Sequence, residues 1–181
     1  MMSTLRVVVA GASGRMGGQV AALAAGDARF EVAARLHRRT PPEAVAAALA
    51  SAGALIDFTV PEGSVALAAA AAKARAPIVV GTTGFSPAQR RALERCARRT
   101  AVFLSPNFSV GVHLLCRLAA EAARALPGFD AGIVEVHHAA KKDAPSGTAL
   151  RLASAVEKAR GGKPPVPAVS LRLGTSSAST R

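Results

Sequence analysis

Short apolar runs alternate with longer Ala- and Leu-rich segments over most of the chain, and this alternation constrains its fold more than any other feature. The short runs, rich in Val and Ile, span residues 5–10, 30–36, 54–58, 77–81 and 101–105. The longer segments span residues 15–25, 42–50, 62–75, 86–99 and 110–126. Nearly continuous apolar strands separated by helices are typical of a parallel sheet with both faces covered. Because crossovers between parallel strands are right-handed, the sequence predicts a doubly wound, Rossmann-type α/β fold.

The pattern changes after Pro127, where the alternation gives way to one strand, one helix and one further strand. These elements are expected at residues 130–138, 146–160 and 168–173. We therefore predict a first domain over residues 1–126 and a second, α+β domain over residues 127–181. One helix and two strands build a poor independent core, because so small a unit buries little apolar surface. The second domain is expected to be incomplete or to need a partner.

The charge of the chain favours an anionic ligand. The 181 residues carry a formal net charge of +12, and such a field attracts nucleic acid, acidic lipid or small phosphates and carboxylates. Nucleic-acid-binding proteins usually add aromatic side chains on which bases stack, whereas this chain has six Phe and neither Trp nor Tyr. We therefore expect a small anionic molecule rather than nucleic acid.

Several features bear on where the protein works. The longest apolar-leaning run, residues 44–56, is shorter than the roughly 20 residues that a membrane span needs. The first residues lead directly into a strand, so no cleavable leader is expected. Cys96 and Cys116 lie in helix-like segments and are interpreted as reduced residues in or near the core, a disulfide being the alternative. These features predict a cytoplasmic protein outside the membrane, and no metal site is predicted.

A glycine-rich turn follows the first strand and carries the pattern G-x-x-G-x-x-G, at Gly11, Gly14 and Gly17. The first glycine permits a tight turn, the second lets the backbone approach a pyrophosphate, and the third lets the helix pack on the strand. The helix N-terminus offers N–H donors to the phosphates. A turn with packing value alone is the alternative. The residues expected to contact a dinucleotide here are Gly11, Ala12, Ser13, Gly14, Arg15 and Met16.

The end of the second predicted strand bears on the choice of dinucleotide. An acidic residue is expected there to bind the ribose hydroxyls. The sequence ARLHRRT, residues 34–40, has no acid and places Arg38 in this region. Arginine suits a 2′-phosphate, so NADPH is favoured over NADH. The alternative is a basic loop that faces water.

Two further turns follow the fourth and fifth predicted strands. An open parallel sheet binds its ligands at the carboxyl ends of its strands, where both turns begin. Backbone, hydroxyl, amide and aromatic groups of these turns are suited to a nicotinamide and its ribose. Each turn taken singly is also compatible with ordinary turn chemistry. The cofactor-contacting residues expected here are Gly81, Thr82, Thr83, Asn107 and Phe108.

A helix start lies within EVHHAAKKDAPSGTAL, residues 135–150. Pro145 and Ser146 mark it, with Asp143 or Ser146 as the capping residue. Backbone N–H groups around Ser146, Gly147 and Thr148 then point at an anion, for which a carboxylate is a natural guest. A basic strand end followed by an ordinary capped helix is the alternative.

The same stretch offers a cation and a proton donor. Lys141 supplies a full positive charge, and His137 or His138 can donate a proton near neutral pH. The combination fits an acidic small molecule that is reduced by hydride and then protonated.

Five stretches of the chain, in order, resemble one enzyme family. They are VVVAGASGRMG, IDFTVPEG, VVGTTGF, SPNFSVGVHLL and EVHHAAKKDAPSGTAL, within residues 5–156. The resemblance is to the 4-hydroxy-tetrahydrodipicolinate reductase (dihydrodipicolinate reductase) family of the diaminopimelate route to lysine. It implies NAD(P)H-dependent reduction of a cyclic, imine-containing dicarboxylate, and a homotetramer built through the sheet of the substrate domain.

The resemblance also implies roles for single residues. His137, the first histidine of the pair, and Lys141 are implied to act in proton transfer. His138, Gly147 and Thr148 are implied to hold the substrate, with Ser146 lining the same anion site. The cofactor is implied to contact residues 11–16, 81–83 and 105–108, and Arg38 to meet a 2′-phosphate.

The chain also departs from the pattern of that family. Ala139 and Ala140 stand where family members commonly have basic residues, and His37 stands where many carry the ribose-binding acid. Family members continue beyond the strand VSLRL with a Gly-Glu-His segment, further strands and a final helix. We therefore expect a chain shortened at its C-terminus, by a frameshift or premature stop. The alternative function is a catalytically impaired remnant that binds dinucleotide.

Overall fold

The computed structural model describes residues 4–162 and 164–174 and divides into two compact units, Met1–Pro106 and Asn107–Arg181. The division therefore falls after Pro106, whereas the sequence predicts a boundary at 126/127. The reason is that the helix at residues 110–125 packs against a later helix of the second unit. The outermost residues of the two predicted domains, 1–3 and 175–181, lie outside the described residues.

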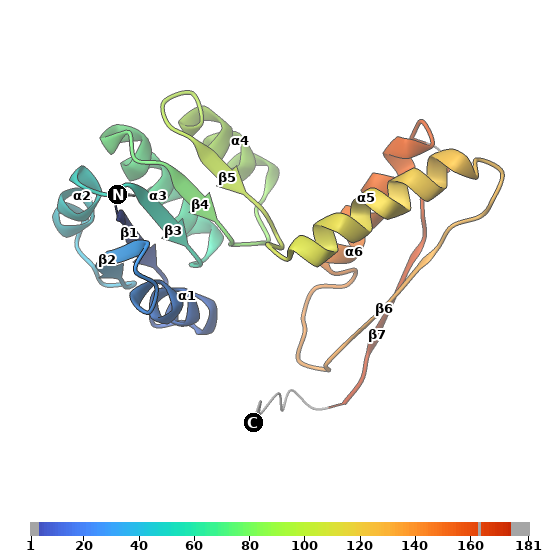
Figure 1. The fold of residues 1–181 in the computed structure, drawn as a ribbon, viewed down its shortest axis with the longest axis horizontal. Coiled ribbons are helices and arrows are strands. Elements are labelled where there is room, and N and C mark those ends of the chain that lie inside the picture. Colours follow the sequence, from blue (N-terminus) through green and yellow to red (C-terminus); the bar gives the residue numbers. More distant parts are fainter. Residues whose placement is uncertain (1–3, 163, 175–181) are drawn as a thin grey trace. The chain divides into compact units, whose positions relative to one another are not determined.

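The first unit is a five-stranded parallel sheet in the order β2-β1-β3-β4-β5 (Figure 1). All four pairs of neighbouring strands are parallel, so the predicted doubly wound α/β fold is confirmed. The strands are β1 (Leu5–Ala10), β2 (Phe30–Leu36), β3 (Ala54–Asp57), β4 (Ile78–Val80) and β5 (Val102–Leu104). The helices are α1 (Arg15–Ala25), α2 (Pro42–Ala50), α3 (Pro61–Ala74) and α4 (Pro87–Cys96).

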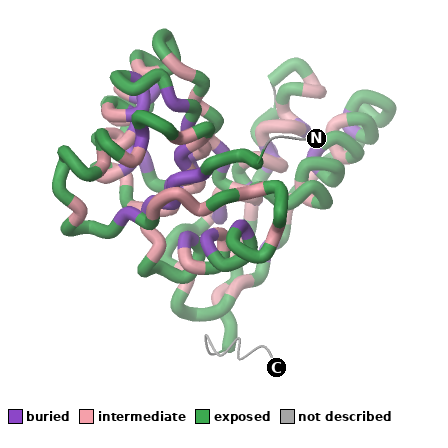
Figure 2. Tube along the Cα trace, turned by 60° about the vertical axis from the view of Figure 1, so that its left-hand side comes forward, coloured by how far each residue is buried: buried purple, intermediate pink, exposed green. Residues whose placement is uncertain are grey.

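One face of this sheet packs against α2, α3 and α4. Alternate strand residues such as Val8 and Leu55, which are fully buried, form one core with Leu49 of α2, Ala68 of α3 and Leu93 of α4. Residues that alternate with these, such as Val7 and Val9 of β1, point to the opposite face, where α1 packs on β1 and β2. The central strands are thus the buried segments of this unit (Figure 2).

The register of the strands brings their carboxyl ends to one edge of the sheet. Ala10 of β1 pairs with Asp57 of β3, Asp57 with Val80 of β4, and Val80 with Leu104 of β5. The segments that follow these strands, beginning at residues 11, 58, 81 and 105, therefore start next to one another. This is the edge at which the sequence predicts the cofactor site.

The second unit is a smaller layer of two helices and two strands. It contains α5 (Val110–Ala125), β6 (Ile133–His137), α6 (Gly147–Ala159) and β7 (Ala168–Arg172). The strands are parallel and are connected through α6, and α5 packs along α6. Its core consists of Ala123, Ala153, Val156 and Val166, with half-buried neighbours around them.

The two-stranded sheet of the second unit buries only one of its faces. Ile133, Glu135 and His137 of β6 are buried or half-buried, whereas the residues between them are exposed. The exposed face of the described sheet and the residue after it is apolar throughout: Val134, Val136, Val169, Leu171 and Leu173. The strands alternate with a period of two, which distinguishes this sheet from the doubly covered one of the first unit.

Among the described residues, no helix is both long and apolar enough to cross a membrane. Cys96 and Cys116 are free thiols, half-buried and buried respectively, as expected from the sequence.

Candidate functional site

Glycine is required at one position of the turn between β1 and α1 and at one position in the first turn of α1. Gly11 has a φ of 75°, and a Cβ there would lie 2.5 Å from the carbonyl oxygen of Phe58. A Cβ on Gly17 would lie 2.2 Å from the carbonyl oxygen of Gly11. Side chains are therefore excluded where the turn folds onto β3 and where α1 packs on it.

The outer side of the same turn is open. Ser13, Gly14, Arg15 and Met16 are exposed, and Ala12 is half-buried. Gly14 caps α1 without a side-chain hydrogen bond, so no side chain of the cap competes for the first N–H groups of the helix. An exposed, backbone-lined helix start of this kind can hold a phosphate.

The end of β2 is hydrogen-bonded to the glycine turn. The N–H groups of Gly11 and Ala12 both approach the carbonyl oxygen of Leu36, at 3.1 and 3.4 Å. The turn after Leu36 is fixed because His37 N donates to Thr40 Oγ1 at 2.8 Å. Arg38 is exposed in this turn, two residues from the strand end that contacts the glycine turn. Arg38 thus follows a strand end that is hydrogen-bonded to the glycine turn, and its contact with a 2′-phosphate stays a prediction.

Gly81, at the end of β4, is packed against the residue that follows β3. A Cβ on Gly81 would lie 2.1 Å from the ring of Phe58, and Gly81 N donates to the carbonyl oxygen of Asp57 at 2.8 Å. Thr82 is buried, whereas Thr83 is exposed. Phe58 thus touches both the first glycine turn and the turn after β4.

A buried polar network behind these turns was not anticipated from the sequence. Asp57 is fully buried, and its Oδ1 accepts hydrogen bonds from the backbone N–H and the hydroxyl of Thr59, at 2.9 and 2.6 Å. The hydroxyl of Ser64, also fully buried, donates to Thr82 Oγ1 at 2.8 Å. A charged residue at the end of an otherwise apolar strand was the available signal. The network fixes the turn that contains Thr82 relative to β3.

The last predicted cofactor segment, residues 105–108, spans the division between the units. Ser105 is buried in the first unit, and Ser105 N donates to the carbonyl oxygen of Val80 at 3.1 Å. In the second unit, Asn107 Oδ1 accepts from Ser109 N at 2.7 Å, and Asn107 Nδ2 donates to Thr148 Oγ1 at 3.0 Å. Pro106 and Phe108 are exposed. The structure thus joins Asn107, a predicted cofactor residue, to Thr148, a predicted substrate residue.

The helix start within residues 135–150 is α6, and Ser146 is its cap. Ser146 Oγ accepts a hydrogen bond from Ala149 N at 3.1 Å, so Ser146 rather than Asp143 caps the helix. Ser146 is buried, while Gly147 and Thr148 are half-buried. The accessible part of the predicted anion site is therefore formed by Gly147 and Thr148, with Ser146 behind them.

His137, at the end of β6, lies against a buried carboxylate. Its Nδ1 is 3.1 Å from Glu135 Oε2, and its side chain is 34% exposed whereas that of Glu135 is 8% exposed. Glu135 Oε1 accepts from Ser146 N and from Arg172 Nη2, each at 3.0 Å. The hydrogen bond from the Ser146 side chain, opposed by burial, is the largest effect that lowers the pKa of Glu135 to about 2. Glu135 is therefore ionised. His138, the residue after His137, is exposed.

Lys141 is held by a carboxylate of its own loop. Its Nζ is 2.7 Å from Asp143 Oδ1, and this hydrogen bond is the main reason that the pKa of Asp143 is lowered. Arg172 of β7 donates to the carbonyl oxygens of Lys141 and Asp143 as well as to Glu135. Its guanidinium therefore fixes the loop between β6 and α6. Glu135 and Arg172 were missed by sequence reasoning, although a glutamate within an apolar strand was a signal.

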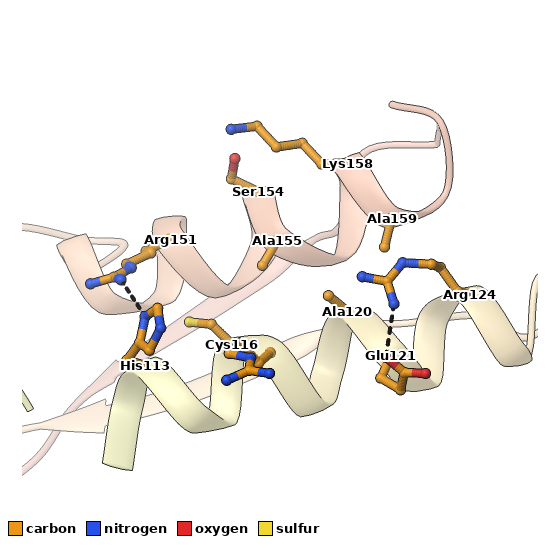
Figure 3. A pocket seen from close by; sticks show the side chains of 11 residues that line it. His113, Cys116, Ala120, Glu121, Arg124, Arg151, Ser154, Ala155, Lys158 and Ala159 are labelled. Atoms are coloured by element: carbon orange, nitrogen blue, oxygen red, sulfur yellow. Dashed lines mark hydrogen bonds and ion pairs between the residues drawn. The ribbon is translucent and has the colours of Figure 1, made fainter. Parts of the chain in front are cut away.

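A separate groove of about 610 Å³ lies between α5 and α6 (Figure 3). His113 and Arg151 approach each other across it, with 3.0 Å between Nδ1 and Nη2. None of the predicted site residues lines this groove. The candidate site residues therefore lie at two places, the sheet edge in the first unit and the β6–α6 loop in the second.

Comparisons with known proteins agree on one family. Residues 5–108 match the family described as "Dihydrodipicolinate reductase, N-terminus", and residues 111–180 match "Dihydrodipicolinate reductase, C-terminus". The 4-hydroxy-tetrahydrodipicolinate reductase of Stenotrophomonas maltophilia is 44% identical over 94% of this chain and 75% of its own length. That of Anaeromyxobacter dehalogenans is 40% identical over 88% of this chain and 67% of its own length.

A solved structure shares the fold. The dipicolinate-bound dihydrodipicolinate reductase from Paenisporosarcina sp. TG-14 is similar with a TM-score of 0.74, at 22% sequence identity, over 94% of this chain and 79% of that one. The family models and the relatives confirm the resemblance found in the sequence, and this structure confirms the fold.

Proposed function

The chain belongs to the dihydrodipicolinate reductase family, and on this premise we propose that it reduces 4-hydroxy-tetrahydrodipicolinate to tetrahydrodipicolinate, taking up hydride from NAD(P)H and a proton and releasing the hydroxyl group as water. The observation that carries the proposal is the β6–α6 loop. It places an imidazole against a buried carboxylate, and it contains a lysine and an accessible helix start. A dicarboxylate that gains a hydride and a proton needs these groups.

The sheet edge of the first unit is proposed to bind the dinucleotide, whose reduced nicotinamide supplies the hydride. The β1–α1 turn fits a pyrophosphate, because its inner positions exclude a Cβ and its outer side is exposed backbone. Gly81, Thr82 and Thr83, together with Ser105 to Phe108, line the nicotinamide end. The exposed Arg38 favours a 2′-phosphate, so we propose NADPH as the preferred cofactor.

The N-terminus of α6 is proposed to bind a carboxylate of the substrate. Gly147 and Thr148 present the accessible backbone of this helix start, and His138, which lies nine positions before Gly147 in the sequence, is exposed. Lys141 adds a positive charge once its Nζ leaves Asp143. Ser146 acts from behind, because its side chain caps the helix and is buried.

His137 is proposed as the group that delivers the proton. Its imidazole is partly exposed, so a ligand can reach it, and its Nδ1 faces the ionised carboxylate of Glu135 at 3.1 Å. Lys141 is the second candidate for proton transfer, as the resemblance implies.

The experiment is the oxidation of NADPH by the purified chain with freshly prepared substrate, together with a fluorescence titration of NADPH without substrate. Turnover that depends on substrate is the expected result. Binding of NADPH without turnover at any protein concentration would reject the reductase activity and support the remnant instead. Loss of both would reject the dinucleotide site as well.

For assembly, the family resemblance implies a homotetramer, but we propose that this chain associates without a fixed stoichiometry. The apolar face of β6 and β7 is exposed in the described chain, and such faces pair readily. Light scattering is expected to give a monomer together with heterogeneous aggregates, and a uniform tetramer would contradict this. We also propose a cytoplasmic location and no nucleic-acid partner, which cell fractionation and nucleic-acid binding assays test.

A further inference from the structure

Glu135 joins three elements of the second unit through one carboxylate. Its Oε1 accepts from the backbone N–H of Ser146, at the start of α6, and from Arg172 of β7. Its Oε2 faces His137 of the same strand at 3.1 Å from Nδ1. The two oxygens therefore have different partners. Oε1 accepts from the Ser146 backbone and the Arg172 guanidinium, and Oε2 faces the imidazole of His137.

Oε2 and Nδ1 face each other at 3.1 Å. Both atoms are buried, and within the described residues neither makes a hydrogen bond, so an Nδ1–H turned toward Oε2 is the arrangement that satisfies both. An ionised carboxylate only accepts hydrogen bonds, so the proton between the two atoms belongs to the imidazole. Neutral His137 is then the Nδ1–H tautomer, and its Nε2 is the nitrogen left for a ligand.

We propose that Glu135 is the positioning residue that fixes His137 as the Nδ1–H tautomer, so that Nε2 is the atom that takes up and delivers the proton. The inference rests on the proposed function for the role of His137, but the tautomer itself does not depend on turnover. The neighbouring charges support it. Arg172 and the backbone N–H of Ser146 both donate to Oε1 of Glu135, whereas Lys141 is paired with Asp143.

The test uses Glu135→Gln, which is nearly the same shape. Ser146 N and Arg172 both donate to Oε1, so the side chain of the variant must keep an oxygen there and turn its NH₂ group toward His137. An NH₂ group donates to Nδ1 and selects the opposite tautomer, with the proton on Nε2. The network toward α6 and β7 is retained, and only the polarity toward the imidazole is reversed.

The measurement is the ¹⁵N spectrum of the imidazoles, recorded at a pH high enough for the rings to be neutral. His137→Gln is used to assign the His137 signals. The wild-type chain is expected to show a protonated Nδ1 at His137, and Glu135→Gln a protonated Nε2. Asp143→Asn is the matched carboxylate-to-amide control, because Asp143 contacts Lys141, and it should leave the His137 tautomer unchanged. An Nε2–H tautomer in the wild type, or the same tautomer in wild type and Glu135→Gln, would overturn the proposal.

A kinetic measurement separates this inference from the proposed function. If the chain turns over, Glu135→Gln should lower kcat at least roughly 100-fold, with NADPH affinity unchanged, because general acid catalysis contributes about that much. If the chain does not turn over, the proposed function fails while the tautomer measurement still decides the role of Glu135. An active Glu135→Gln with wild-type kcat would count against the proposal.

Discussion

The first unit shapes its candidate binding turns with backbone, whereas the second shapes its candidate site with charged side chains. At the sheet edge, Gly11, Gly17 and Gly81 are required because neighbouring backbone or ring atoms leave no room for a Cβ. In the β6–α6 loop, Glu135 and Arg172 hold the site through hydrogen bonds and an ion pair. The sheet edge of the first unit needs a rigid scaffold, and the β6–α6 loop of the second needs only a few correctly placed charges.

The cores of the two units differ in the same sense. The first sheet is covered by helices and buries large side chains such as Leu55 and Ile78 completely. The second core is small and rich in alanine, and its sheet leaves an apolar face exposed. Apolar packing can therefore stabilise the first unit strongly, while polar contacts contribute a larger share of the stability of the second unit.

The largest effect is expected from the proton-transfer residue of the second unit. His137→Gln should lower kcat by a factor of roughly 10² to 10⁴, because it removes the general acid, and should leave NADPH affinity unchanged. Steady-state kinetics and NADPH fluorescence measure the two quantities. Equal losses in both would mean that the residue does not act in proton transfer.

A matched pair of leucines tests the difference between the cores. Leu55→Ala removes a fully buried side chain of β3 and should lower the free energy of unfolding of the first unit by about 2–5 kcal/mol. Leu171→Ala, on the exposed face of β7, should change the free energy of unfolding of the second unit by roughly 0.5 kcal/mol or less. Denaturant unfolding measures both, and similar losses would show that the face of β7 is covered in solution.

Arg38 tests whether a side chain also contributes to the backbone-built site. Arg38→Ala should weaken NADPH binding by about 1.5–3 kcal/mol, the usual range for a hydrogen bond to a charged group, and should hardly affect NADH. Fluorescence titration with both cofactors measures the change in preference. Equal weakening of NADPH and NADH binding would mean that Arg38 does not contact the 2′-phosphate.

Acid is expected to destabilise the folded chain through Glu135. The pKa of Glu135 is lowered from 4.5 to about 2 in the folded chain, so its ionised form contributes to stability above pH 4.5. This contribution is lost as the pH falls from 4.5 toward 2. Unfolding curves over this range should show a steeper acid loss in the wild type than in Glu135→Gln. An equal acid loss of stability in the wild type and in Glu135→Gln would mean that Glu135 does not cause it.

The sequence predicted the elements of the fold closely, because apolar periodicity is a local property. The predicted strands at residues 5–10 and 30–36 and the helix at 15–25 agree with β1, β2 and α1 at both ends. The division of the chain was not predictable in the same way. The apolar face of α5 is visible in the sequence, but that face does not identify α6 as its partner.

The predicted site residues are found at two places, yet the residues that hold them were missed. Glu135 and Arg172 are 37 positions apart, and nothing local connects them before the strands pair. Ser64 of α3 and Thr82 of the turn after β4 are also far apart in the sequence, and their hydroxyl groups are hydrogen-bonded only in the folded chain. Motifs show which groups are available for chemistry, whereas their supports arise only from tertiary contacts.

The pairing of Lys141 with Asp143 makes the proposed binding of a dicarboxylate an exchange rather than an addition. An incoming acid replaces one that the chain already carries, so the number of lysine–carboxylate contacts stays the same. The affinity then reflects a difference between two ion pairs, and added salt should weaken both sides of that balance together.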